Sequence, residues 1–347
     1  MMDLEIPERL IPVRDKIDEF VKTKIDPVTE EFHTSNNPDD EWSLSDRQLE
    51  ILDGLKEEAH EAGLWNFFLP ESQGGAGVSN LEYAHLAEVM ARNPMASEVF
   101  NCAAPDTGNM EVLERFGTEE QKQKFLVPLL KSTVTAWQKF TEPSSGADLA
   151  NYESKATRDG DDWRLTGQSV FVSGRGKEPE YLFGPMMTDS DAPRHRNLGF
   201  FMIPVRDADG TPTEGLEIRN QNLVNGGDQH FIFMDDVRVT GDHLIGGDHQ
   251  GWQVAQTSLE QEHGGRGNAF PDDVMVDHLL TWMQDKSQNT DIQKQTAMDA
   301  YNDFRVDNIL AKRTYWMYSN KMSIQHEGNV ANVHNREYQC RNQIRVR

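Results

Sequence analysis

The sequence predicts an α+β protein whose helices and strands occupy separate stretches of the chain. Over roughly the first third, apolar residues recur at the spacing of amphipathic helices. Short segments rich in β-branched and aromatic residues follow, separated by Gly, Asp and Pro, and helical patterns return from Trp252 onward. This order favours segregated α and β regions over alternating βαβ units.

Two helices are predicted near the start of the chain. Apolar residues from Leu10 to Ile25 recur at helical spacing, and we expect Pro27 to end that run. A second helix is expected to begin near Ser43, where the residues suit a capping box, and to end at Gly63.

Two more helices are predicted before the β region. One covers about residues 81–92 with Asn80 as its cap, and the other covers about residues 118–131 and is opened by Thr118. The glycine-rich stretch at 74–77 is expected to be a loop.

The middle of the chain is predicted to form strands. Five segments have the residue types and spacing of strands: 134–140, 163–173, 181–187, 198–205 and 230–239. Residues 158–161 have the chemistry of a hairpin turn. After the strands, the helical pattern is clearest over 298–318.

The size and the net charge of the chain limit its domain number and its classes of binding partner. A chain of 347 residues is expected to form two or three compact units. Its formal net charge of −24 argues against binding nucleic acid or anionic membranes through a basic surface.

No apolar run approaches the roughly 20 residues of a membrane span, and the first residues lack the order of a secretory signal. The two distant cysteines, Cys102 and Cys340, imply no disulfide framework, so we expect a cytoplasmic location.

Several catalytic patterns are absent from the sequence. It has no G-x-G-x-x-G between a strand and a helix, no Walker loop, no G-x-S-x-G elbow and no C-x-x-C pair, which argues against Rossmann, P-loop and α/β-hydrolase chemistry. His243 and His249 lie on a predicted loop without a matching set of ligands. We therefore expect surface histidines there and no metal site.

The most informative run is F-T-E-P-S-S-G-A-D at residues 140–148, where the first predicted strand ends. A threonine hydroxyl and exposed amides in such a loop can hydrogen-bond a polar ring edge or a phosphate. By residue chemistry alone, an ordinary turn is the alternative.

This run resembles the T-E-P-x-x-G-S-D motif of the acyl-CoA dehydrogenase family. Three later segments, 171–174, 235–239 and 245–252, are similar to further family motifs in the same order. The segment 100–110 is similar to the branch whose animal members carry a fused kinase-like domain. The resemblance extends from about residue 10 to about residue 265.

The resemblance implies three domains and a flavin cofactor. We expect an N-terminal helical domain over 1–133, a middle antiparallel β-domain over 134–245, and a C-terminal helical bundle over 246–347 that lacks part of the family's usual end. FAD is expected between the β-domain and the bundle.

Six residues fall at positions where the family motifs approach the cofactor or thioester: Phe140, Thr141, Gly146, Ala147, Phe171 and Ser173. Phe140 and Thr141 would meet the flavin ring through backbone and hydroxyl groups. Gly146 and Ala147 would lie near the phosphates or the thioester, although Ala147 replaces the family's serine. The third pair would flank the ring, and for Phe171, which replaces the family's tryptophan, a core aromatic residue in a strand is the alternative.

The family reaction also needs a carboxylate that removes a proton α to the thioester carbonyl, and desolvation of that base favours the reaction. The chain has no C-terminal I-Y-E-G-T motif. Glu262 falls at the alternative position for the base, in an L-x-x-E-R-like pattern where His263 replaces arginine. A solvated acidic helix face is the other interpretation.

Taken together, the resemblance implies an FAD-dependent oxidoreductase that desaturates an acyl-CoA and passes electrons to an electron-transfer flavoprotein. A homodimer or homotetramer is expected, or a heteromeric assembly. Two alternatives stay open: a flavin monooxygenase or oxidase of the same fold, and a non-catalytic subunit that completes a partner. The R-x-x-F-G pattern of many members is missing from 277–300.

Overall fold

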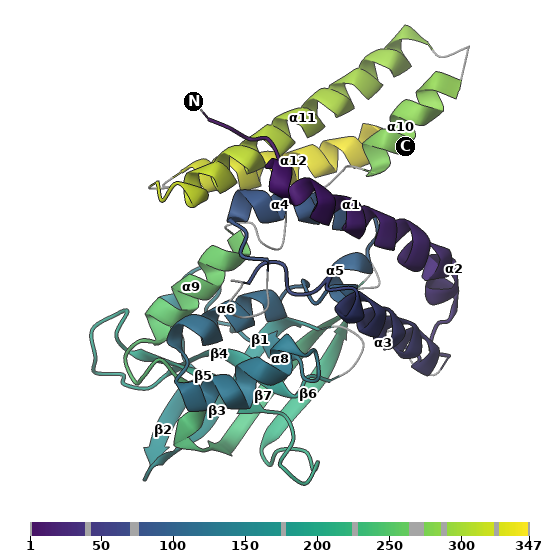
Figure 1. Cartoon of the computed structure of the whole chain (residues 1–347). Helices are drawn as coiled ribbons and strands as arrows, with labels where there is room; N and C mark the ends of the chain where they lie inside the picture. Colours follow the sequence, from purple (N-terminus) through teal and green to yellow (C-terminus); the bar gives the residue numbers. More distant parts are fainter. Residues whose placement is uncertain are drawn as a thin grey trace. The chain divides into compact units, whose positions relative to one another are not determined.

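The computed structural model describes residues 2–38, 43–69, 76–174, 178–223, 228–263, 274–285, 290–322 and 326–345 (Figure 1). The chain forms two compact units. The first, here called the helical unit, comprises Met1–Glu30, Gly54–Cys102 and Glu262–Arg347. The second, the sheet unit, comprises Glu31–Asp53 and Ala103–Gln261. The predicted α+β class, with helices before and after a β region, is confirmed.

The N-terminal helical run continues past the proline that was expected to end it. Its segments follow without a break: η1 (Glu8–Leu10), α1 (Ile11–Phe20), η2 (Val21–Ile25) and α2 (Asp26–Thr34). Proline lacks an N–H and its ring clashes with the carbonyl four residues earlier in an α-helix. Here η2 is a π-helical turn that lies just before Pro27, and its wider turn lets the helix continue.

Two predicted helix starts are displaced by one or two residues. α3 (Asp46–Glu61) is capped by Ser45, whose hydroxyl accepts the N–H of Gln48 at 3.2 Å, so the cap is not at Ser43. α4 (Asn80–Met90) is capped by Ser79 in a capping box, so Asn80 is the first helical residue.

Other predictions for the helices hold. Gly63 follows α3 with φ +70°, the left-handed conformation expected of a glycine that ends a helix. Thr118 forms a capping box at the start of α7 (Glu119–Gln121), which continues through η4 (Lys122–Leu126) into α8 (Val127–Leu130). The loop predicted at 74–77 lies partly outside the described residues.

The remaining helical segments are α5 (Ala96–Val99), α6 (Asp106–Phe116), α9 (Gly251–His263), α10 (Val274–Asp285), α11 (Asp291–Ser319) and α12 (Glu327–Arg345). The helix expected at 298–318 is the main part of α11, and the helical pattern gave no separate prediction of α5 or α6.

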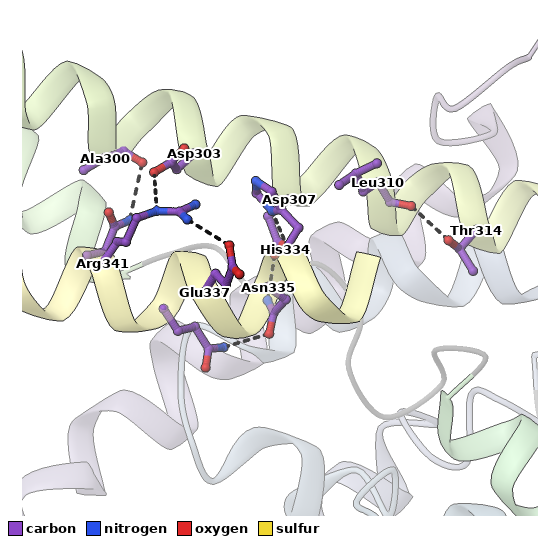
Figure 2. A network of polar contacts seen from close by, with 11 residues as sticks. Ala300, Asp303, Asp307, Leu310, Thr314, His334, Asn335, Glu337 and Arg341 are labelled. Carbon is purple, nitrogen blue, oxygen red and sulfur yellow. Dashed lines mark hydrogen bonds and ion pairs between the residues drawn. The ribbon is translucent and has the colours of Figure 1, made fainter. Parts of the chain in front are cut away.

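α11 and α12 pack side by side and share a polar seam (Figure 2). Asp307 is buried and accepts a hydrogen bond from the Asn335 amide at 2.8 Å. Nδ1 of His334 lies 3.4 Å from the same carboxylate. Buried polar groups that are matched in this way fix the register of two helices, because a shift leaves them without partners.

The sheet unit contains one eight-stranded sheet. The strands are β1 (Ala136–Gln138), β2 (Lys155–Asp159), β3 (Asp162–Ser173), β4 (Tyr181–Met187), β5 (Leu198–Pro204), β6 (Leu216–Asn222), β7 (Asp228–Val239) and β8 (Leu244–Ile245). Their order is β6-β7-β3-β2-β4-β5-β8, with β1 paired to β4. Most pairings are antiparallel, as expected, but β1 and β2 run parallel to β4, so the sheet is mixed.

All five predicted strands are present, and β2, β6 and β8 are additional. The predicted turn at 158–161 joins β2 to β3, with Asp159 opposite Asp162 and Gly160 at φ +67°. β4 and β5 are buried along almost their full length, and Phe183 packs edge-on against Phe200 with ring centroids 4.6 Å apart. This buried pair of strands forms the centre of the unit's apolar core.

Candidate functional site

The loop after β1 carries the first group of predicted site residues and is anchored to β3. A tight turn is closed by two backbone hydrogen bonds between Glu142 and Ser145, at 2.8 and 3.2 Å. The carbonyl of Thr141 accepts the N–H of Val170 in β3 at 2.8 Å. This bond brings the loop of Phe140 and Thr141 beside the β3 segment that carries Phe171.

The Glu142 carboxylate holds this loop in place. Glu142 is only 4% exposed, and its two oxygens accept the backbone N–H groups of Glu153 at 2.6 Å and Ser154 at 2.7 Å. Hydrogen bonds from N–H donors to a carboxylate are among the stronger ones in proteins. Glu142 is therefore engaged within the protein and is a poor candidate for a catalytic base.

Phe171 lies at a β-bulge in β3. The pairing of β3 with β7 shifts register between Ser169 and Val172, and Phe171 there has φ +58°. Before the bulge the odd-numbered residues of β3 face the core, whereas Val170 and Val172 are buried after it. The bulge thus turns the Phe171 ring outward, where it is 55% exposed.

This geometry rules out the interpretation of Phe171 as a core aromatic residue. A bulky residue in the left-handed region costs on the order of 1–3 kcal/mol, and such strain concentrates at functional sites. The hydrogen bond between Val170 and Thr141 and the pairing of Val172 with His230 hold the bulge on both sides.

Ser173 lies at the end of β3, two residues beyond the bulge, and is exposed like Phe171. The chain is fixed directly after it, because a Cβ on Gly174 would lie 2.2 Å from the Trp137 ring. Trp137 in turn stacks on His230 with ring centroids 4.1 Å apart, and Nδ1 of His230 lies 3.1 Å from the Val172 carbonyl. These contacts leave no room for a side chain at Gly174.

The remaining loop residues of the predicted site, Gly146 and Ala147, are exposed. A Cβ on Gly146 would meet only the Thr141 methyl group, at an ordinary 3.7 Å. The hydroxyls of Thr141 and Ser173 form no hydrogen bond with any residue that the structure describes. An outward aromatic ring with two such hydroxyls suits a planar aromatic ligand that has a polar edge.

Glu262 lies near the end of α9, which runs from Gly251 to His263. The Glu262 side chain lies outside the described part of the chain, so its role stays a prediction.

Beneath the loop lies a buried polar cluster that the sequence did not indicate as a site. Lys139 follows β1 and is fully buried. Its Nζ donates to the Tyr152 hydroxyl and the Pro185 carbonyl, both at 3.0 Å, and lies 3.2 Å from the sulfur of Met186. Burial lowers the pKa of Lys139 from 10.5 to about 7, although the negative charge of Glu142 opposes this shift.

The expectation of a surface histidine at His243 is wrong. Its ring is buried, with Nδ1 2.5 Å from the Met202 carbonyl and Nε2 2.9 Å from Nζ of Lys124. Burial lowers its pKa. His249 is exposed, as expected, with Nδ1 2.9 Å from the Arg196 carbonyl.

Comparisons with known proteins connect this chain and its fold to a family. Residues 8–133 match the family model of the acyl-CoA dehydrogenase N-terminal domain. Acyl-CoA dehydrogenase family member 10 of Mus musculus is 37% identical over 265 residues, which are 73% of this chain and 24% of that protein. Acyl-CoA dehydrogenase family member 11 of Homo sapiens is 34% identical, over 70% of this chain and 31% of that protein.

A solved structure assigned as an acyl-CoA dehydrogenase of Mycobacterium abscessus superimposes with a TM-score of 0.86 at 26% identity, over 99% of this chain and 88% of that one. By its N-terminal domain, its fold and these relatives, the chain belongs to the acyl-CoA dehydrogenase family. It spans only about a quarter to a third of the length of the two curated relatives. In the described residues, no helix has the length and apolar character needed to cross a membrane.

Proposed function

We propose that this protein is an FAD-dependent oxidoreductase that removes hydrogen from the α and β carbons of an acyl-CoA thioester. The observation that carries this proposal is the outward, strained Phe171 at the β3 bulge, hydrogen-bonded through its neighbour Val170 to Thr141. Both segments match flavin-site motifs of the family to which the chain belongs.

The residues of the site fit a flavin. The exposed Phe171 ring offers a flat apolar face, and the Thr141 and Ser173 hydroxyls offer hydrogen bonds to a polar ring edge. We assign Phe140 to backbone contact with the ring. Gly146 and Ala147, whose surroundings are open, are assigned to the cofactor phosphates or the thioester.

When bound, FAD supplies the acceptor for the hydride that leaves the β-carbon. We assign removal of the α-proton to the carboxylate of Glu262. Support for this role comes from its position on α9 and from the engagement of Glu142, the glutamate of the T-E-P motif, in hydrogen bonds within the protein. Electron transfer to an electron-transfer flavoprotein and assembly as a homodimer or homotetramer are part of the proposal, as is the three-domain division at 133 and 245.

The first experiment is an absorption spectrum of the purified chain after incubation with FAD and desalting. A retained flavin spectrum is expected, and its bleaching by acyl-CoAs without oxygen would support dehydrogenation. A chain that retains no flavin would instead be a non-catalytic subunit. If the chain retains flavin but no acyl-CoA in a series of graded chain lengths reduces it, the result would favour a monooxygenase or oxidase.

Glu262→Gln tests the base. The variant should retain flavin, because the amide has the same size, but should reduce it about 10²–10⁴-fold more slowly, since a positioned base contributes that much. Stopped-flow bleaching by the best acyl-CoA measures the rate. Glu260→Gln, two residues earlier on α9, is the matched control and should react at the wild-type rate. Wild-type reduction by Glu262→Gln would place the base elsewhere.

A further inference from the structure

Lys139 closes a ring of contacts that joins the two flavin-facing segments. Its Nζ donates to the Tyr152 hydroxyl at 3.0 Å, and that hydroxyl lies 3.4 Å from the hydroxyl of Ser169 in β3. Val170 follows Ser169 and donates to the carbonyl of Thr141, two residues after Lys139. The ring therefore runs from the loop after β1 to the β3 bulge and back.

The fold makes specific room for this lysine. A Cβ on Gly184 in β4 would lie 2.2 Å from the Lys139 carbonyl oxygen and 2.6 Å from its Cγ. The Lys139 N–H also donates to the Phe183 carbonyl at 2.9 Å. A buried ammonium group is costly unless hydrogen bonds replace its lost hydration, and here the Tyr152 hydroxyl and the Pro185 carbonyl accept from it.

We propose that Lys139 is a positioning residue for the flavin, holding the Thr141 loop and the Phe171 bulge in register through Tyr152 and Ser169. This inference rests on the proposed function, and it adds a residue that none of the family motifs quoted above contains.

The surroundings of Lys139 make its charge, and with it the strength of its hydrogen bonds, sensitive to pH. The ionisable groups near it are Glu142, whose charge attracts it, and Tyr152, whose phenol pKa is raised by burial. β4 contributes the Pro185 carbonyl and the Met186 sulfur, and β3 contributes the Ser169 hydroxyl. Because the pKa of Lys139 is about 7, the amine loses its charge near neutral pH, and its hydrogen bond to the Tyr152 hydroxyl weakens as the pH rises.

The test is the affinity of the full chain for FAD, measured by quenching of flavin fluorescence from about pH 6 to about pH 8.5. Wild type should bind about tenfold more weakly at the upper end, because Lys139 loses its charge and the hydrogen-bonded link through Tyr152 loosens. Lys139→Met should bind weakly with a flat pH profile. Its melting temperature without cofactor should fall, because the Tyr152 hydroxyl and the Pro185 carbonyl lose a hydrogen-bond donor. The flat pH profile is therefore the result that a purely structural role would not produce. Lys155→Met, at an exposed position on β2, should behave as wild type.

The outcomes separate this inference from the proposed function. Wild type that binds no FAD overturns both, whereas Lys139→Met with wild-type affinity and pH profile overturns the inference alone. A Lys139→Met protein that binds weakly but keeps the pH dependence of wild type would show a purely structural role and overturn it too. Should Lys139→Met fail to fold, Tyr152→Phe carries the test, since it removes the link between Lys139 and Ser169. Unchanged FAD affinity in that variant contradicts the proposal.

Discussion

Single residues of the T-E-P motif have different tasks. Thr141 presents a hydroxyl for which no described residue is a partner, whereas Glu142 is buried and accepts two backbone N–H groups. The motif thus combines the residue that we propose to face the ligand with the residue that fixes its loop. A search for catalytic acids would select Glu142 wrongly, because its carboxylate is already satisfied by the chain that follows η5 (Leu149–Asn151).

Glu142→Gln should destabilise the protein by about 2 kcal/mol, because one of the two backbone donors then faces an amide NH₂. Thermal unfolding of the protein without cofactor measures this effect. Glu153→Gln, a neighbouring exposed glutamate, is the control and should change stability by less than about 0.5 kcal/mol. A Glu142→Gln protein with the same melting temperature as wild type would show that the two hydrogen bonds contribute little to stability.

The sequence identified candidate site residues that lie in a motif and missed a polar cluster that packing creates. Thr141 and Phe171 were found because they lie in motifs shared with a family. Lys139 and Tyr152 lie 13 residues apart and meet only when β1, β3 and β4 assemble around them. Linear spacing gives no sign of such a cluster, although a lysine at the end of the apolar stretch before Phe140 was a weak signal.

At the scale of elements, residue pattern predicted strands well and helix ends less well. β4 begins and ends as predicted because it is short, apolar and bounded by turn residues. The N-terminal helix passes Pro27 because a π-helical turn absorbs the missing hydrogen bond. The helix caps fell on Ser45 and Ser79, one or two residues from the expected positions, because neighbouring Ser, Asn and Asp residues compete as caps.

The proposed cofactor site depends on the β3 bulge, and two variants of Phe171 test it. Phe171→Gly should be more stable than Phe171→Ala by about 1 kcal/mol, because only glycine adopts φ +58° without strain. Both variants lose the ring and should bind FAD about tenfold more weakly, as expected for one lost aromatic contact.

Thermal unfolding and flavin fluorescence of the two Phe171 variants measure these effects separately. Phe233→Ala, on the neighbouring strand β7, is the control for loss of a sheet aromatic residue and should retain FAD affinity. Equal stability of the glycine and alanine variants would argue against a strained bulge. Unchanged FAD binding by both would remove Phe171 from the cofactor site.

At the scale of the whole molecule, each of the two units buries a histidine in its neutral form. In the helical unit, burial of His85 in α4 lowers its pKa to about 4, and the positive charge of Lys312 adds to this effect. In the sheet unit, burial likewise lowers the pKa of His243. An unfolded histidine titrates near 6.5, so below that pH the unfolded chain binds more protons than the folded one. Stability should therefore fall as the pH drops below about 6.5.

The size of this acid sensitivity can be bounded. Solvent screening reduces the contribution of His85 to about 2 kcal/mol, spread between pH 6.5 and pH 4. The formal net charge of −24 acts in the opposite direction, because protonation relieves self-repulsion. The difference between wild type and a variant isolates the histidine, since both share the background charge.

Melting temperatures of wild type, His85→Gln and His243→Gln should therefore be compared from about pH 7.5 to about pH 5. Each variant should lose less stability on acidification than wild type, because glutamine does not titrate. His326→Gln is the control, since the side chain of His326 is 76% exposed and its replacement should leave the pH profile unchanged. If wild type and both buried variants decline in parallel, the acid sensitivity belongs to other groups and these histidines are protonated in the folded protein.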